Sequence, residues 1–233
     1  MKKTEWNCSQ VCPSRRTGMF CGLGHDCWDY LNKGKTSNIY QPRQALYYEG
    51  NRNYGVYCIN SGRVKLYKSG RSGRQQIIHV AKAGEVLGIA SLLANEPCNT
   101  TAETLEETRV CFIEKTIFLA SLKMDFRLVE NSLSHLGKEV VTTLNRLESA
   151  VQKPVKQRVA EVILSYIKEN SPERDGSVAL NLSRVEMAEM ADTAPETFIR
   201  SIRELESKKY IKMDSKRKRI KVLEPELLAK LAD

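Results

Sequence analysis

The sequence predicts an α+β protein with an antiparallel β-roll, then a long helix, then a winged helix-turn-helix. Short alternating apolar runs punctuated by glycine occupy residues 38–115, and a nearly heptad apolar stripe follows at residues 133–151. Two short helical patterns and a basic hairpin pattern occupy residues 183–223. With 233 residues and 41% hydrophobic content, the chain can bury two cores. We expect a Cys-rich segment (1–30), the β-roll (31–122), the long helix (123–152) and the winged helix-turn-helix (153–233).

The β-roll is predicted from phrases such as VYCINSG, RVKLYKSG and RQQIIHV, which alternate in polarity and end at glycine. In RVKLYK we expect Val64 and Leu66 to point inward and Arg63, Lys65 and Tyr67 to point outward. Many short strands with frequent turns are typical of an antiparallel roll and not of a doubly wound α/β domain.

The long helix carries apolar residues at intervals of three and four, which places them in one stripe. Two interpretations stay open: the stripe pairs with the same helix of a second copy, or it lies on its own domain. Its length and near-heptad spacing favour self-pairing. Pro154 ends the helix and can open the next one. The predicted dimer interface consists of Leu133, Leu136, Val140, Leu144, Leu147 and Val151.

The helix-turn-helix is predicted from the segment LSRVEMAEMADTAPETFIRSIRELES. Ser183 precedes Glu186 by three residues, which is the spacing of a capping box at a helix start. This helix ends at the turn ADTAP, and a second helix begins at Pro195. The second helix has an inward stripe formed by Phe198, Ile202 and Leu205.

Positive charge is concentrated after the second helix. The formal net charge is +9 with a pI near 9.2, which suits an acidic polymer as partner. Residues 208–221 contain eight Lys or Arg against one acid, Asp214. Two strands flank the phrase DSKRK, so the tip of this wing is cationic and suited to phosphate, which fixes register but reads no sequence.

Base reading is expected from Glu196 and Arg200, one turn apart on the outer face of the second helix. An arginine fork matches the edge of guanine, and a carboxylate can accept from cytosine. The alternative is an ordinary surface ion pair, which the surrounding turn and wing disfavour. The candidate DNA contacts are Ser183, Arg184, Glu196, Thr197, Ile199, Arg200, Arg203, Lys216, Arg217 and Lys218.

Three phrases resemble the CRP/FNR superfamily of bacterial transcription regulators: YYEGNRNYGVYCINSGRVKLYKSG, AGEVLGIASLL and APETFIRSI, the last matching E-[ST]-x-x-R at Glu196, Thr197 and Arg200. The resemblance covers almost the whole chain. It implies a cyclic-nucleotide-binding-like sensor roll, a long dimerisation helix, a homodimer on a palindromic operator in double-stranded DNA, and RNA polymerase as a partner if the protein activates. Glu196 and Arg200 would read a G·A core, Thr197 would touch the backbone, and Ile199 would contact a thymine methyl.

Although some members of this superfamily bind cyclic AMP, we do not expect it to be the effector of this chain. Cyclic-AMP binders carry a G-E-[LI]-[SG] cassette followed by R-[ST]-A, whose glutamate and arginine hold the ribose and the phosphate. This chain has Ile89 and Thr100 at those places. The loss of the charged phosphate partner removes the strongest type of hydrogen bond from the site.

The seven cysteines raise the question of a metal or redox site. By resemblance to the oxygen-sensing FNR branch, a [4Fe-4S] cluster would be held by Cys8, Cys12, Cys21 and Cys111, although the spacing of the first three departs from the family pattern. Zinc or thiol redox chemistry, and plain burial without metal, stay open beside it.

The other cysteines have simpler expectations. Cys27 is a further candidate ligand, Cys58 lies inside an apolar strand and is expected in the core, and Cys98 is expected to be exposed in the loop NEPCNT.

The remaining features separate the classes of function. The sequence shows no paired acid and base groups of the kind that would indicate an enzyme. An iron-sulfur redox or electron-transfer protein without a DNA role is the alternative, and a cyclic-nucleotide module of a larger enzyme is disfavoured because the chain ends in a winged helix. No apolar run is long enough to span a membrane, so we expect a cytoplasmic protein.

Overall fold

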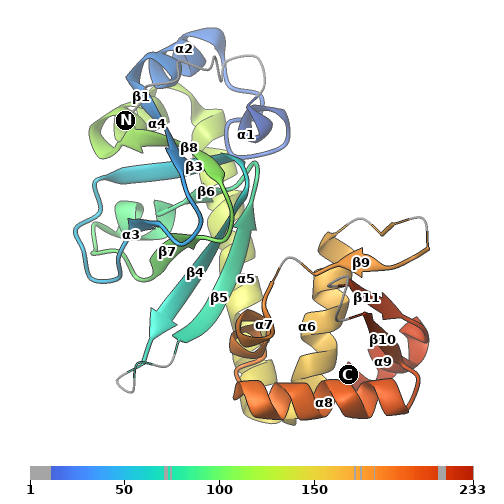
Figure 1. Ribbon diagram of the computed structural model, residues 1–233. Helices are drawn as coiled ribbons and strands as arrows, with labels where there is room; N and C mark the ends of the chain where they lie inside the picture. The colour runs from blue at the N-terminus through green and yellow to red at the C-terminus, as the bar shows by residue number, and fades with distance from the viewer. Residues whose placement is uncertain are drawn as a thin grey trace. The chain divides into compact units, whose positions relative to one another are not determined.

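The computed structural model describes residues 12–70, 73, 75–170, 172–173, 175–180, 182–214 and 219–232. The chain divides into two compact units (Figure 1). The first unit contains Met1–Gly73 and Ile78–Thr142, and the second contains Arg74–Ile77 and Thr143–Asp233. This division falls inside the long helix α5 (Phe126–Gln152), so the four segments expected from the sequence stay a prediction.

The first unit contains two antiparallel four-stranded sheets that form the expected β-roll. The first sheet has the order β1 (Lys35–Tyr40), β8 (Thr108–Glu114), β3 (Gly55–Ser61) and β6 (Val86–Leu87). The second sheet has the order β2 (Ala45–Tyr47), β7 (Thr101–Thr104), β4 (Arg63–Ser69) and β5 (Gln75–Lys82). The helices of this unit are α1 (Pro13–Arg16), α2 (His25–Gly34), α3 (Ile89–Ala94), α4 (Lys115–Met124) and the first part of α5.

Strand β4 shows why alternation alone does not determine exposure. Val64 and Leu66 pack in the core between the sheets, as the pattern predicted. Lys65 and Tyr67 were expected to be exposed, but they are only 8% and 7% accessible. Lys65 Nζ lies 3.2 Å from Oε1 of its cross-strand neighbour Glu103 and 4.9 Å from the centre of the Tyr67 ring. This ion pair and ring contact allow an ammonium group to be buried on the outer face of the sheet.

The N-terminal segment is a packed part of the first unit. Phe20, Trp28 and Leu31 belong to the same buried cluster as Cys58 and Ile113, which lie on the outer face of the first sheet. The Phe20 and Trp28 rings lie 6.3 Å apart, within the range of favourable aromatic contact. The described part of the Cys-rich segment therefore covers one face of the roll.

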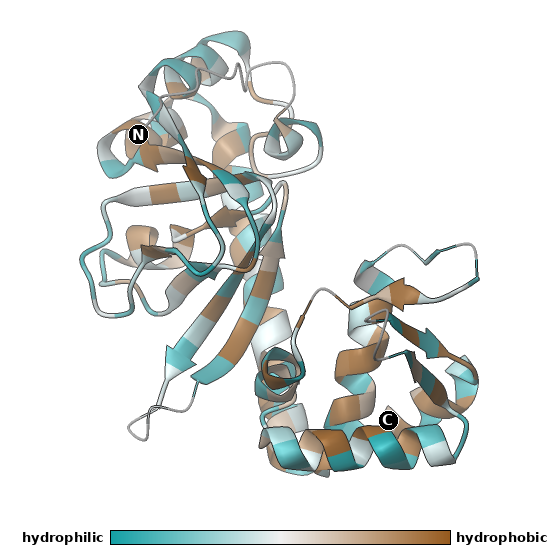
Figure 2. Ribbon diagram, in the orientation of Figure 1, coloured by the Kyte–Doolittle hydropathy of each residue, from teal (hydrophilic) through white to brown (hydrophobic). Residues whose placement is uncertain are grey.

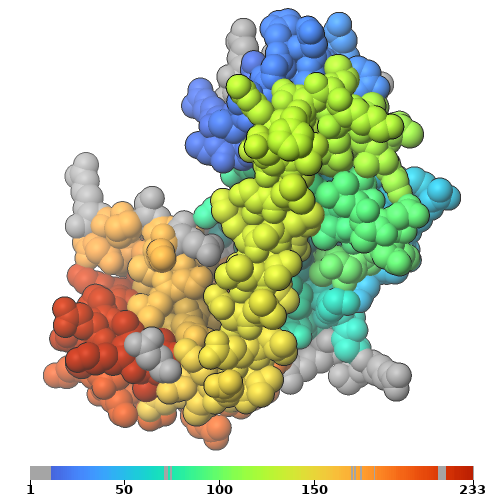
Figure 3. Space-filling view, turned by 180° about the vertical axis from the view of Figure 1, so that it is seen from behind, coloured from blue at the N-terminus to red at the C-terminus, as the bar shows by residue number. Residues whose placement is uncertain are grey.

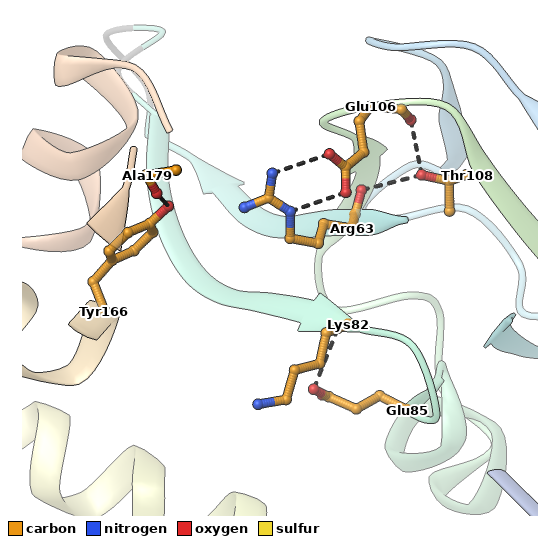
Figure 4. Close-up of polar contacts among 7 residues, drawn as sticks. All are labelled: Arg63, Lys82, Glu85, Glu106, Thr108, Tyr166 and Ala179. Carbon is orange, nitrogen blue, oxygen red and sulfur yellow. Dashed lines mark hydrogen bonds and ion pairs between the residues drawn. The ribbon is translucent and has the colours of Figure 1, made fainter. Parts of the chain in front are cut away.

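The turn between β3 and β4 is fixed by polar contacts (Figure 4). Nε and Nη2 of Arg63 each donate to a carboxylate oxygen of Glu106 at 3.0 Å. The Thr108 hydroxyl donates to the carbonyl of Glu106 at 2.8 Å. Gly62 occupies the turn at φ +88°, a conformation that favours glycine.

Helix α5 has an open surface, drawn in yellow in Figure 3, and most members of its apolar stripe are exposed. Leu136 is half-buried against the core of the first unit. The other five members are between 58% and 76% exposed: Leu133, Val140, Leu144, Leu147 and Val151.

The second unit contains the expected winged helix-turn-helix. Its core is formed by residues such as Ile163 of α6, Met187 of α7, and Phe198 and Leu205 of α8. Hydropathy alternates around α8 and along the strands, as the colouring shows (Figure 2). Its elements after α5 are α6 (Val155–Glu169), β9 (Val178–Ala179), α7 (Arg184–Met190), α8 (Pro195–Ser207), β10 (Ile211–Asp214), β11 (Arg219–Val222) and α9 (Pro225–Ala232).

One hydrogen bond joins the short strand of this unit to its first helix. The Tyr166 hydroxyl of α6 donates to the Ala179 carbonyl of β9 at 3.0 Å (Figure 4). Strand β9 pairs with β11, so α6 is connected to the three-stranded sheet of the wing. In the described part of the chain, no helix is long and apolar enough to cross a membrane.

We predict that Gly62→Ala lowers the free energy of unfolding by about 2 kcal/mol or more, because a side chain at this φ is strained and lacks space. A Cβ at this position would lie 2.7 Å from the Glu107 carbonyl oxygen and 2.8 Å from Cα of Thr108. Gly50→Ala is the matched control, since Gly50 has a similar φ of +82° but no atom within 4 Å of the added Cβ. Urea titration of both variants measures the difference, and equal losses of stability would contradict the steric part of this prediction.

Candidate DNA-binding surface and N-terminal thiols

The first helix of the helix-turn-helix begins with the predicted capping box. Ser183 Oγ accepts from the Glu186 N–H at 3.1 Å, and the Ser183 N–H donates to Glu186 Oε2 at 2.7 Å. The turn that follows contains Asp192 at φ +48°. The N–H of Thr193 donates to the Ala188 carbonyl at 3.0 Å, which closes the end of the helix. Sequence and structure therefore agree on where α7 begins and where α8 follows it.

Helix α8 separates its buried and exposed faces as predicted. Phe198, Ser201, Ile202 and Leu205 are buried. Glu196, Arg200 and Arg203 are exposed, Thr197 and Ile199 are half-buried, and Ser183 and Arg184 are exposed at the start of α7.

The outer face of α8 has the side chains and the space that a polar ligand needs. Among the described residues, Glu196 and Arg200 form no ion pair with each other, in contrast to the surface-pair alternative. A hollow of about 250 Å³ beside the helix is lined by the polar residues Arg184, Arg203 and Glu206 and by the apolar residues Phe198, Ile199, Ile202 and Met213. Two guanidinium groups against one carboxylate give this lining a net positive charge, which favours an anionic partner.

The wing has the expected strands. In β10 and β11, Met213 pairs with Ile220 and Asp214 pairs with Arg219. The predicted phosphate contacts Lys216, Arg217 and Lys218 at its tip lie outside the described residues. The pairing of β10 with β11, which follow α8 in the chain, agrees with the two strands that the sequence predicted.

Two contacts that orient α8 were not predicted. Glu206 Oε1 accepts from the Met213 N–H at 2.8 Å and so joins the helix to the wing. Lys156 of α6 hydrogen-bonds the Glu204 carboxylate, which lowers the pKa of Glu204 and raises that of Lys156. Sequence periodicity places these side chains on a helix face, but it does not identify their partners.

Ile89 and Thr100, the two uncharged residues singled out in the cassette region, are both buried. Ile89 is 1% exposed and belongs to the apolar cluster beneath the roll. Thr100 is buried and hydrogen-bonds the Tyr47 side chain, whose pKa is raised by burial. Both side chains therefore serve the packing of the roll.

Of the four cysteines in the cluster hypothesis, the structure describes Cys12, Cys21 and Cys111, and it brings two of them together. Cys12 and Cys111 line one cavity of about 10 Å³ together with Cys58. Cys21 is exposed, and its thiol donates to the Arg16 carbonyl at 3.2 Å. Cys8 lies outside the described residues.

A [4Fe-4S] cluster needs four thiolates that converge on one point and room for the cluster itself. In the part of the chain that the structure describes, no group of three or more Cys, His, Asp or Glu side chains could hold a metal ion. A cavity of about 10 Å³ has room for no more than one water molecule. The described thiols therefore do not fit the cluster in this arrangement.

The remaining cysteines are structural. Cys58 lies in the core, as expected, and directly opposite Cys111 on the neighbouring strand. Cys98 was expected to be exposed, but it is only 6% accessible. The Cys27 thiol is buried and donates to the Ser121 carbonyl at 3.7 Å, and burial raises its pKa. A buried, protonated thiol is a poor metal ligand, which weakens Cys27 as a candidate.

The N-terminal segment is hydrogen-bonded to the start of α5. Arg127 Nη1 donates to the Gly22 carbonyl at 2.6 Å, and Asn131 Nδ2 donates to the carbonyls of Met19 and Cys21 at 2.9 and 3.0 Å. Asp125 accepts from the N–H groups of Gly24 and Arg127, which lowers the pKa of its carboxyl.

Two family models match the chain in consecutive regions. The cyclic nucleotide-binding domain matches residues 38–125, and the Crp-like helix-turn-helix domain matches residues 157–231. A CRP-like cAMP-activated global transcriptional regulator of Mycobacterium tuberculosis is 21% identical over 86% of this chain and 91% of its own length.

Solved structures share the fold. FixK2 from Bradyrhizobium japonicum has a TM-score of 0.76 at 22% identity and covers 85% of this chain and 98% of its own. A CooA mutant from Carboxydothermus hydrogenoformans has a TM-score of 0.77 at 15% identity and covers 100% of this chain and 98% of its own.

The order of the two matched domains, the α8 face and these relatives agree with one another. The chain belongs to the CRP/FNR superfamily and is a transcription regulator with a DNA-binding helix-turn-helix.

Proposed function

We propose that this regulator binds a palindromic operator in double-stranded DNA as a homodimer, and that its N-terminal unit receives the signal. The observation that carries the proposal is the outer face of α8, where Glu196, Arg200 and Arg203 are exposed opposite a buried apolar stripe. An amphipathic helix after a tight turn, with a wing behind it, is suited to the major groove.

The homodimer is supported by the exposed stripe of α5. Leu133, Val140 and Leu147 are spaced by seven residues, and Leu144 and Val151 lie one turn after the last two of them. A monomer that leaves such a continuous apolar stripe in water loses the stabilisation that burial would provide. A heptad spacing is the pattern by which two copies of one helix pack together.

Within each half-site, we assign base contacts to Glu196 and Arg200 and a thymine contact to Ile199. Thr197, Ser183, Arg184 and Arg203 contact the backbone. Lys216, Arg217 and Lys218 of the wing tip supply further phosphate contacts, which strengthen binding to any sequence. If the protein activates transcription, RNA polymerase is a further partner.

We infer that the signal reaches α5 through the N-terminal segment and is not cyclic AMP. Asp125, Arg127 and Asn131 hydrogen-bond this segment to the first turns of α5, so a change in the segment alters contacts of the dimerisation helix. The relative named above is activated by cAMP, but here Ile89 and Thr100 replace the charged pair of the cassette. The buried thiols of Cys12, Cys58 and Cys111 line one cavity in this unit, so a chemical change to any of them would alter the packing around it.

We predict that Arg200→Ala abolishes the preference for a palindrome while the dimer persists. Each good base contact contributes about 1–3 kcal/mol of discrimination, and the change removes one from each half-site. Fluorescence anisotropy on an inverted repeat selected from a random duplex library, and on its scrambled version, measures this preference. A variant that still chooses its site as the wild type does would contradict the recognition assignment.

Leu144→Glu is the control for Arg200→Ala, because it disrupts the proposed dimer and leaves the DNA-binding face intact. A carboxylate in the α5 stripe opposes pairing, so sedimentation should show a monomer. This variant keeps the α8 face and should therefore retain its preference for a single half-site, while the gain from the second half-site disappears.

We predict that cyclic AMP at about 1 mM changes neither the melting temperature nor the affinity for the selected palindrome. A ligand that binds the folded state stabilises it by RT ln(1 + [L]/Kd), so a binder would raise the melting temperature with its concentration. The palindrome itself serves as the positive control in the same assay. A saturable rise with cyclic AMP would contradict the reading of Ile89 and Thr100.

We predict that protein purified without oxygen contains substoichiometric iron and acid-labile sulfide, because the described thiols do not converge. Cys21→Ser should match the wild type in absorbance and DNA binding, since Cys21 is exposed and directed at the Arg16 carbonyl. About four iron and four sulfide per protomer that the substitution abolishes would contradict this prediction and restore the cluster.

A further inference from the structure

The second unit contains a guanidinium group that joins two helix ends. Arg158 lies in the first turn of α6 and is half-buried. Its Nε donates to the Ala191 carbonyl at 3.1 Å, and its Nη2 donates to the Asp192 carbonyl at 3.0 Å. Its Nη1 donates to the carbonyls of Ala150 and Lys153 at 3.2 and 3.4 Å. One side chain therefore binds the turn of the helix-turn-helix and the end of α5 at the same time.

All four acceptors lie where helices leave carbonyl groups unpaired. Ala150 is in the last turn of α5, and Lys153 follows its end. Ala191 is the C-cap of α7, and Asp192 follows it. The C-terminus of a helix carries partial negative charge, so a cation that donates hydrogen bonds there stabilises both ends.

The shape of arginine is necessary for this contact. A guanidinium has five N–H donors in a fixed planar fork and stays charged at any physiological pH. Lysine has three donors on one atom, and it can cap one helix end but cannot span two in a fixed relative orientation. The Asp192 carbonyl is also held in a strained turn, because Asp192 has φ +48° without being glycine.

Other contacts make the end of α5 a fixed partner. Glu161 of α6 accepts from Ser149 and from Lys153 Nζ, the latter at 2.8 Å. Lys153 Nζ also donates to the Ala232 carbonyl at 2.6 Å. The last turn of α5 therefore moves with α6, and Arg158 extends this rigid connection to the turn that precedes α8.

We propose that Arg158 is a positioning residue for DNA recognition, because it fixes α8 relative to the end of the dimerisation helix. In a twofold dimer, the separation of the two recognition helices sets the spacing of half-sites that the protein accepts. The guanidinium fork thus determines spacing selectivity without touching DNA. This inference rests on the proposed homodimer and palindrome.

The test compares wild type with Arg158→Lys and Arg158→Gln as full chains. Lys168→Gln is the matched control, because it removes an exposed charge from the last turn of the same helix. The probes are the inverted repeat that wild type selects from a random duplex library, the same half-sites moved closer or further apart by one or two base pairs, and a scrambled duplex. Dissociation constants, thermal unfolding and sedimentation are measured at one salt concentration.

We expect Arg158→Lys to raise the dissociation constant for the best-spaced repeat about tenfold, and that for the altered spacings by less, so that spacing preference is lost. The preference for a half-site over scrambled DNA should persist, because the α8 face is intact. Lys168→Gln should retain the spacing preference. Arg158→Gln should resemble Arg158→Lys wherever it stays folded.

Two results would overturn the inference. The first is that Arg158→Lys keeps the wild-type ratio of dissociation constants between spacings and also keeps the wild-type melting temperature. The second is that Arg158→Lys keeps this ratio but melts at a lower temperature, which would show that Arg158 only stabilises the fold. A wild-type chain that enriches no inverted repeat would instead overturn the proposed function, and this inference with it.

Discussion

The hydrogen bonds at the two ends of α5 are the contacts on which the regulator depends. At its start, Arg127 and Asn131 bind carbonyl groups of the Cys-rich segment. At its end, Arg158 binds the last turn and also the turn before the recognition helix. Arginine or asparagine side chains donate to backbone carbonyls at both ends, so each contact depends on backbone position. Helix α5 therefore has its first turns hydrogen-bonded within the first unit and its last turn hydrogen-bonded within the second.

Sequence reasoning was accurate where the determinant is local. The capping box at Ser183, the start of α8 at Pro195 and the buried stripe of α8 all follow from spacing within one helix. Lys65 shows the limit, because its burial depends on Glu103, a residue 38 positions away that only strand register brings opposite. Leu136 fits the stripe by spacing, yet its side chain is partly buried against the core of its own unit.

The thiols show the same limit at the candidate sensor. The resemblance to the FNR branch grouped Cys12 with Cys21, but the fold turns the Cys21 thiol toward the Arg16 carbonyl. Cys58 was read as core because it lies in an apolar strand, and it is core; strand pairing also places it opposite Cys111. A residue can therefore be a packing element and also the direct cross-strand neighbour of another thiol. The sequence pattern of a single strand does not reveal which residue will lie opposite a cysteine, because the strand register is set by the whole sheet.

A signal can change DNA binding only if it stabilises two arrangements of the protein unequally. In the first unit, Ile89 packs in the apolar cluster and Thr100 is hydrogen-bonded to Tyr47, so neither side chain is a charged partner for a bound anion. The cavity at Cys12, Cys58 and Cys111 belongs to the same cluster that anchors Phe20 and Trp28. A chemical change there would alter the packing of the segment that Arg127 and Asn131 hold. Such a change would reach the first turns of α5 through the hydrogen bonds of Arg127 and Asn131.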